Sequence, residues 1–129
     1  MVLDTSALLA LLLDEPEAED FRAAVEEDTT RLVSAATLLE TALVIEARKG
    51  ERGGQELDTL IQKAEVLVVP VDAEHVFEAR RAFRRFGKGR HAAGLNVGDV
   101  FAYALARTAG EPLLFKGDDF AKTDVGRVL

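Results

Sequence analysis

The stretch Glu65-Val66-Leu67-Val68-Val69-Pro70-Val71 decides the expected fold. It is a near-continuous apolar run rich in β-branched residues, which is typical of a strand buried on both faces. Such strands belong to parallel sheets, because the crossover connections cover both faces of the sheet with helices. We therefore expect a parallel sheet with helices packed on each side.

Helical segments are predicted on both sides of this strand. Before it, residues 55–64 place Leu57, Leu60 and Ile61 on one helical stripe. After it, Asp72 is expected to cap a helix that runs to about residue 86. The strand therefore lies between two helices, as in a βα repeat.

The same alternation continues along the chain. A later helix is expected over residues 97–109, capped by Asn96 and ended by Gly110. Gly50 and the Gly53-Gly54 pair are expected to interrupt the helical pattern. Further strands are expected at 1–4, 31–34 and 112–115, and further helices at 5–13, with Thr5 or Ser6 as cap, at 17–27 and at 37–49. This order predicts an α/β fold, a three-layer α/β/α sandwich with a central parallel sheet, in one domain spanning residues 1–129.

Composition excludes several kinds of site. The chain has no Cys and two His, so disulfides, cysteine nucleophiles and thiolate zinc sites are ruled out, and a zinc site has few ligands to draw on. We interpret His75 and His91 as ordinary surface residues. The longest apolar stretch, residues 7–13, is too short to span a bilayer, and no basic segment precedes the first strand. We expect a soluble cytoplasmic protein without a signal peptide or a membrane partner.

Charge is distributed unevenly. A formal net charge of −7 disfavours nucleic acid as a partner, because phosphate contacts need Lys and Arg. One segment departs from this balance, since no acid lies between Arg80 and His91. Its six basic residues predict either an RNA-binding surface or a solvated helix face; they are Arg80, Arg81, Arg84, Arg85, Lys88 and Arg90.

Acidic residues fall where a parallel sheet forms its ligand sites, at the carboxyl ends of strands and the adjoining helix starts. They are Asp4 after the first strand, Glu40 in the helix after the second, Asp99 in the first turn of the helix at 97–109, and Asp118 and Asp119 after the last strand. Singly, each of the later acids is equally explained as a helix-dipole, surface or turn residue. Asp4 is the exception, because an Asp directly after a buried strand is costly unless it binds something.

Clustering changes the interpretation of these acids. Carboxylates crowded together repel one another and raise each other's pKa, and a divalent cation removes that penalty. Oxygen ligands favour Mg²⁺, or Mn²⁺, as the cofactor. Such an ion can activate water for an in-line attack on a phosphodiester. The neighbouring Thr5 or Ser6 hydroxyl would hold a carboxylate or a metal-bound water, or serve as a helix cap.

Several segments resemble a known family. Val2-Leu3-Asp4-Thr5-Ser6, Ala36-Thr37-Leu38-Leu39-Glu40 and Leu95-Asn96-Val97-Gly98-Asp99 look like the successive acidic motifs of PIN domains. The segments 84–91 and 114–120, with Thr123-Asp124, are similar to the bacterial VapC toxin branch. The resemblance covers essentially the whole chain in the right order.

This resemblance implies a metal-dependent endoribonuclease, the toxin of a VapBC type II toxin–antitoxin module, acting as a homodimer. It implies a cognate VapB antitoxin that inserts a basic side chain among the carboxylates. Carried over by motif, Asp4, Glu40 and Asp99 are the metal-site acids, and Thr5, Ser6 and Asn96 are auxiliary. For the fourth acid Asp118 is favoured over Asp119, with Asp124 as the outsider. The basic residues from Arg80 to Arg90 would hold the RNA backbone.

Two alternatives remain at this point. A haloacid-dehalogenase-like phosphatase would use Asp4 as nucleophile and Lys116-Gly117-Asp118-Asp119 near a later strand, but it usually has a second Asp where this chain has Ser6. A non-catalytic binding module, such as a receiver-like domain or an inactive PIN domain, is the other. A stability unchanged by Mg²⁺ or Mn²⁺ would favour the binding module, because a ligand of the folded state raises its stability.

Overall fold

Four parallel strands form the centre of the molecule. The computed structural model describes residues 1–129, and its sheet has the order β3-β2-β1-β4. β1 pairs with β2 through Val2 and Leu32 and with β4 through Val2 and Leu113, and β2 pairs with β3. The strands are β1 (Val2–Leu3), β2 (Leu32–Ser34), β3 (Leu67–Val69) and β4 (Leu113–Leu114). The predicted central parallel sheet is confirmed.

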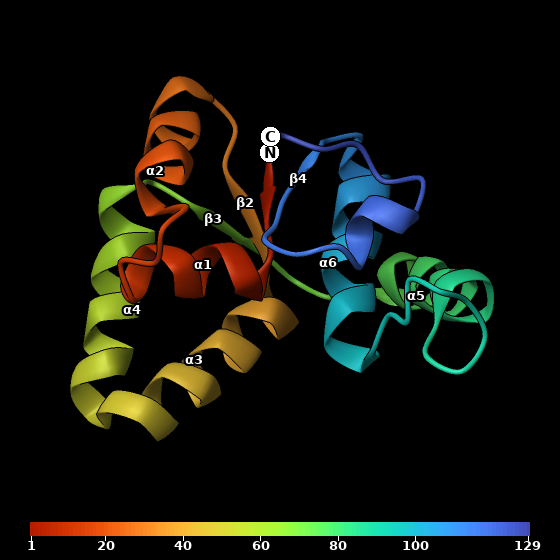
Figure 1. The fold of residues 1–129 in the computed structure, drawn as a ribbon, viewed down its shortest axis with the longest axis horizontal. Coiled ribbons are helices and arrows are strands. Elements are labelled where there is room, and N and C mark those ends of the chain that lie inside the picture. The colour runs from red at the N-terminus through yellow and green to blue at the C-terminus, as the bar shows by residue number, and fades with distance from the viewer.

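Helices cover both faces of this sheet. Figure 1 shows α1 to α4 on one side of the strands and α5 with α6 on the other. The helices are α1 (Thr5–Leu12), α2 (Ala18–Glu27), α3 (Ala35–Lys49), α4 (Glu51–Lys63), α5 (Ala73–Phe86) and α6 (Val97–Ala109), followed by the 3₁₀ helix η1 (Phe120–Lys122). No helix combines the length and the apolar character needed to cross a membrane.

Successive strand residues point into opposite cores, as the pleat of a strand requires. In β1, Val2 packs in the core that contains α5 and α6, whereas Leu3 packs in the core that contains α1 and α2. Leu113 and Leu114 of β4 divide between the same two cores. Two buried cores separated by one sheet confirm the predicted three-layer sandwich.

The strand that predicted the fold is the least buried of the four. Leu67 is 63% exposed and Val68 39% exposed, so the prediction that this strand is buried on both faces is wrong. β3 lies at the edge of the sheet and pairs only with β2. The apolar run therefore indicated the sheet correctly but not its own position within it.

The glycine pair was also misinterpreted, because α4 runs through Gly53 and Gly54 without a break. Gly50, with φ of +68°, makes the turn between α3 and α4. A β-carbon on Gly53 would lie 2.7 Å from the Ile45 carbonyl oxygen. Gly53 therefore lets α4 pack closely against α3, a requirement of tertiary structure that local propensity does not reveal.

Helix starts differ from the predictions at three places and agree at others. α4 begins at Glu51 and not at residue 55. Asp4, rather than Thr5 or Ser6, caps α1, and Ser34 caps α3 so that it begins before residue 37. The predicted caps Asp72 and Asn96 are confirmed, as is the end of α6 at Gly110.

The prediction that both histidines lie on the surface is wrong for His75. That side chain is buried, with Nε2 3.2 Å from the Thr108 hydroxyl oxygen. It lies in the first turn of α5, on the face that packs against α6. His91 is exposed, as predicted.

Candidate functional site

Four acids from four separate elements meet at the carboxyl end of the sheet. Asp4 follows β1, Glu40 lies in the second turn of α3, Asp99 lies in the first turn of α6, and Asp119 immediately precedes η1. Figure 1 shows the starts of α1, α3 and α6 gathered beyond this end of the strands. The charges of Asp4, Glu40 and Asp119 all act on Asp99.

Asp4 is the most deeply buried of these acids, with 4% of its surface exposed. Burial raises the pKa of its carboxyl group, and the charge of Glu40 adds to this effect. Hydrogen bonds from Ser6, one from its amide at 3.0 Å and one from its hydroxyl at 2.6 Å, work in the opposite direction. Asp4 is therefore both the cap of α1 and a buried carboxylate with no cation beside it.

Ser6 links Asp4 to the end of β4. Its hydroxyl donates to Asp4 Oδ2 and accepts a 2.9 Å hydrogen bond from the Lys116 amide. Lys116 is followed by the turn that contains Asp118 and Asp119. The Ser6 hydroxyl thus links the Asp4 carboxylate to the segment that leads into Asp118 and Asp119.

Glu40 is held by a chain of hydroxyl groups. Thr5 Oγ1 donates to Glu40 Oε1 at 2.6 Å, and Thr41 Oγ1 lies 3.1 Å from Thr5 Oγ1. Thr41 is fully buried. Thr5 therefore serves the site by orienting a carboxylate, one of the two roles that the sequence left open.

Asp99 shows the electrostatic strain of the cluster most clearly. Its pKa is raised to about 6, first because of burial and then because of the charges of Asp4, Glu40 and Asp119. The hydrogen bond from the Asn96 amide lowers the pKa but does not outweigh these effects. Asn96 also accepts from the Asp99 amide, so it orients Asp99 through a capping box.

The three acids considered for the fourth position lie in different surroundings. The charge of Asp119 is among the main influences that raise the pKa of Asp99. Asp124 accepts hydrogen bonds from Tyr103 and Arg85 and lies 3.9 Å from Arg107. Partial burial opposes ionisation of Asp124, but these partners outweigh it and lower its pKa. Asp124 thus belongs to a separate ion pair, and the effect of the Asp119 charge on Asp99 favours Asp119 as the fourth acid.

The donor set fits a hard divalent cation. All the candidate ligands are carboxylate oxygens. Burial is the main cause of the raised pKa of Asp99, and the repulsion from Asp4, Glu40 and Asp119 that adds to it is a penalty that a cation would remove. No group of three or more His, Asp or Glu side chains lies close enough to enclose an ion. Mg²⁺ commonly binds one or two carboxylates and keeps several waters, so one or two of these acids would be enough to bind it.

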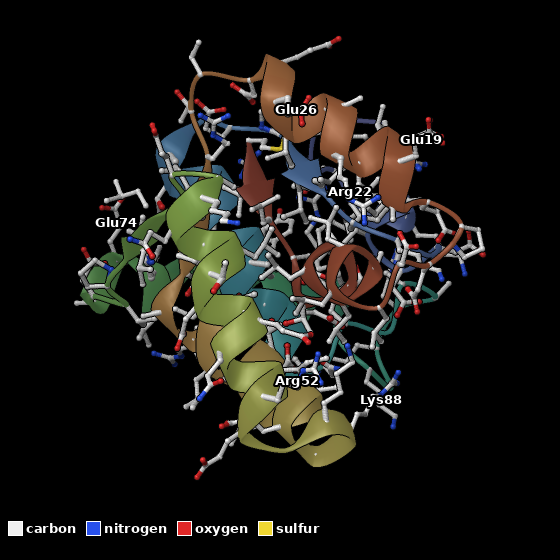
Figure 2. The ribbon with its side chains drawn as sticks, turned by 90° about the vertical axis from the view of Figure 1, so that its left-hand side faces the viewer. Glu19, Arg22, Glu26, Arg52, Glu74 and Lys88 are labelled. Atoms are coloured by element: carbon white, nitrogen blue, oxygen red, sulfur yellow. The ribbon has the colours of Figure 1, made fainter.

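The six basic residues of the 80–90 segment do not form one surface. Arg81 pairs with Glu78, and Arg85 pairs with Asp124. Arg80 and Arg84 instead line an apolar groove of about 370 Å³ between α5 and α6, next to Val97 and Val100. Arg90 lies over the ring of Phe83, a residue that lines the same groove. Lys88 is at the lower right of Figure 2.

Two residues close to the Glu40 carboxylate carry no clear signal in the sequence. The Thr41 hydroxyl forms a hydrogen bond with the Thr5 hydroxyl, and Gly98 lies against the Glu40 carboxylate. Gly98 directly precedes Asp99, and this position beside a candidate metal ligand is the one feature of the sequence that marks it. Thr41 follows Glu40 in an apolar helix and had no distinguishing feature.

Comparisons with known proteins agree with this arrangement. The PIN domain family model matches residues 1–126. Ribonuclease VapC30 of Mycobacterium tuberculosis strain H37Rv is 60% identical over 128 residues, covering 99% of this chain and 98% of that protein. Ribonuclease VapC of Mycolicibacterium smegmatis is 58% identical, with 99% of each chain covered. The crystal structure of M. tuberculosis VapC20, a sarcin-ricin loop cleaving toxin, superposes with a TM-score of 0.78 and covers 96% of this chain and 95% of that one. At 18% sequence identity, this similarity shows a shared fold.

Proposed function

The chain belongs to the PIN domain family, in its VapC branch, and from this premise we propose that it is a Mg²⁺- or Mn²⁺-dependent endoribonuclease, the toxin of a VapBC type II toxin–antitoxin module. One observation carries the metal dependence. Asp99 has its pKa raised to about 6 by burial and by three further carboxylates at the same edge of the sheet. At neutral pH a bound divalent cation would remove the repulsion within this cluster.

Each residue of the cluster has a proposed role. Asp4 and Asp99 would bind the ion directly, while Glu40 and Asp119 would hold waters or complete a second ion site. We prefer Asp119 to Asp118 here because its charge reaches Asp99. The bound ion would activate water and stabilise the leaving oxygen of a phosphodiester. Ser6, Thr5 and Asn96 keep the carboxylates oriented through the hydrogen bonds described above.

RNA would lie along the basic residues that have no acidic partner. Arg80, Arg84, Lys88 and Arg90 make no ion pair within the chain, whereas Arg81 and Arg85 are each paired with an acid. Phosphate contacts by the unpaired group would position the backbone. The net charge of −7 and the carboxylate cluster suit a VapB-type antitoxin that brings a basic side chain to the site.

We also propose that the protein is a cytoplasmic homodimer. Large apolar side chains are exposed on α3, where Leu39 and Leu43 are 59% and 61% exposed, and at the start of α6, where Val97 is 70% exposed. Apolar surface of this kind supports protein association. Replacing Leu43 with Glu is expected to give a monomer by size-exclusion chromatography with light scattering; an unchanged mass would remove Leu43 from the interface.

The phosphatase alternative is not favoured. A phosphatase of that type needs Asp4 free to attack phosphate and a second Asp where Ser6 stands. Here Asp4 is buried and accepts two hydrogen bonds from Ser6. The full-length similarity to VapC ribonucleases also supports the nuclease.

RNA cleavage by purified variants tests the proposal. We expect the wild type to cut RNA with Mg²⁺ or Mn²⁺ and not with EDTA, and Asp4→Asn to be inactive yet folded. Asp58→Asn, at an exposed position on α4, is the matched control and should behave as wild type. Expression of the same variants in cells, with mapping of new RNA 5′ ends, would identify the target. Cleavage that persists in Asp4→Asn, with contaminating nucleases excluded, would refute the assignment of the site.

A further inference from the structure

The Glu40 carboxylate lies directly against the backbone of Gly98. A β-carbon on Gly98 would stand 2.0 Å from Glu40 Oε2, 2.7 Å from Cδ and 2.8 Å from Oε1. Ordinary van der Waals contact begins at 3.4 Å, so a side chain at position 98 would push the carboxylate away by more than an ångström. The backbone φ of Gly98 is outside the left-handed region, so room for Glu40, and not chain conformation, is what this position requires.

Hydroxyl groups also hold the Glu40 carboxylate. Thr5 donates to Oε1 at 2.6 Å, and Thr41 stands 3.1 Å behind the Thr5 hydroxyl and 2.9 Å from the Thr37 carbonyl oxygen. Thr41 has no exposed surface. Because the Thr5 bond is short, a displacement of the Glu40 carboxylate by more than an ångström would disrupt it.

We propose that Gly98 and Thr41 are positioning residues that set the place of the Glu40 carboxylate relative to Asp99. Gly98 does so by leaving space and Thr41 by supporting Thr5. The geometry stands on its own, whereas its consequence for the bound ion rests on the proposed function. Glu40 and Asp99 come from different helices, so the room at Gly98 decides how closely the two charges approach.

Mn²⁺ binding measured by electron paramagnetic resonance of the free ion tests the role of Gly98. Gly98→Ala is expected to weaken Mn²⁺ binding by about tenfold or more, as is typical for residues that orient metal ligands. In a Glu40→Ala background the same change should alter binding by less than about twofold, because changes coupled through one residue are not additive. Gly126→Ala is the matched control, since its β-carbon meets only Pro112, at 3.7 Å. Wild-type affinity in Gly98→Ala, or an equal loss in both backgrounds, would overturn the proposal.

Thermal unfolding of the metal-free protein provides a readout independent of nuclease activity. Alanine at a compatible helical position normally stabilises a protein relative to glycine, by restricting the unfolded chain. We therefore expect Gly98→Ala to raise the melting temperature in the Glu40→Ala background and not in the wild type. An equal rise in both would show that Glu40 is not confined by Gly98. If Glu40→Ala no longer binds Mn²⁺, these melting temperatures test whether Gly98 confines Glu40. The test is valid whether or not the chain cleaves RNA.

Thr41 is tested by a variant pair. Thr41→Val keeps the shape of the side chain and removes the hydroxyl, and it should weaken Mn²⁺ binding severalfold. Thr41→Ser returns the hydroxyl and should restore the affinity. Equal affinity in Thr41→Val and wild type, or failure of Thr41→Ser to restore a lost affinity, would overturn the role of Thr41.

Discussion

Replacing Asp99 with Asn is expected to make the metal-free protein more stable at neutral pH. The pKa of Asp99 is about 6 against an ordinary value of 3.8, and each unit corresponds to about 1.36 kcal/mol. Keeping this carboxylate ionised in the folded protein therefore costs roughly 3 kcal/mol before screening. Asp99 is partly exposed, so we reduce this figure to about 1–2 kcal/mol for solvent screening and the lost helix-dipole interaction. The amide oxygen of Asn can still accept from the Asn96 amide, which preserves the capping box.

The pH dependence of this gain has a definite sign. Between pH 3.8 and about 6 the folded protein holds a proton on Asp99 that the unfolded chain has released, so this residue makes the protein less stable as pH rises through that window. The advantage of Asp99→Asn should thus be complete above about pH 6 and shrink as pH falls toward 3.8.

Circular dichroism during heating, in EDTA, measures the effect. At about pH 7.5 we expect the melting temperature of Asp99→Asn to exceed that of wild type by about 3–8 °C, and at about pH 4.5 by much less. Asp58→Asn should show no such gain. Added Mg²⁺ should stabilise wild type more than Asp99→Asn. A melting temperature equal to or below wild type at pH 7.5, or the same gain at both pH values, would refute the electrostatic interpretation.

Four further substitutions give distinct outcomes. Asp119→Asn should lower RNA cleavage by about a hundredfold, whereas Asp118→Asn should stay within a few-fold of wild type in the same assay; the reverse order would restore Asp118 as the fourth acid. Gly53→Ala should destabilise the protein by about 1–3 kcal/mol in urea unfolding, because its β-carbon would meet the Ile45 carbonyl oxygen at 2.7 Å. Alanine is the better helix former, so a stabilised variant would contradict the close packing of α4 on α3. Tyr103→Phe removes the hydrogen bond to Asp124 and should cost about 1–2 kcal/mol with RNA cleavage retained; a large loss of cleavage would place Asp124 in the site after all.

Local sequence patterns predicted most of the secondary structure, because the signals involved are local. The caps Asp72 and Asn96 and the terminating Gly110 act within one helical turn, and apolar periodicity marks which segments are buried. The order of strands and helices then limits the topology to a parallel sheet. The failures concern contacts that no local pattern contains: Gly53 against Ile45, His75 against Thr108, and the edge position of β3.

For the candidate site, the amino-acid pattern established which residue types are present: carboxylates at strand ends and helix starts, no thiols, and an ordered set of motifs shared with PIN domains. Which acids act on one another depended on how the chain folds. Asp118 and Asp119 are adjacent in the chain, and the charge of Asp119 is among the main influences on the pKa of Asp99. Arg84 and Arg85 are adjacent as well, and only Arg85 reaches Asp124. Neighbours in a turn or helix point in different directions, so their partners depend on the elements packed opposite them, which the chain meets only when it folds.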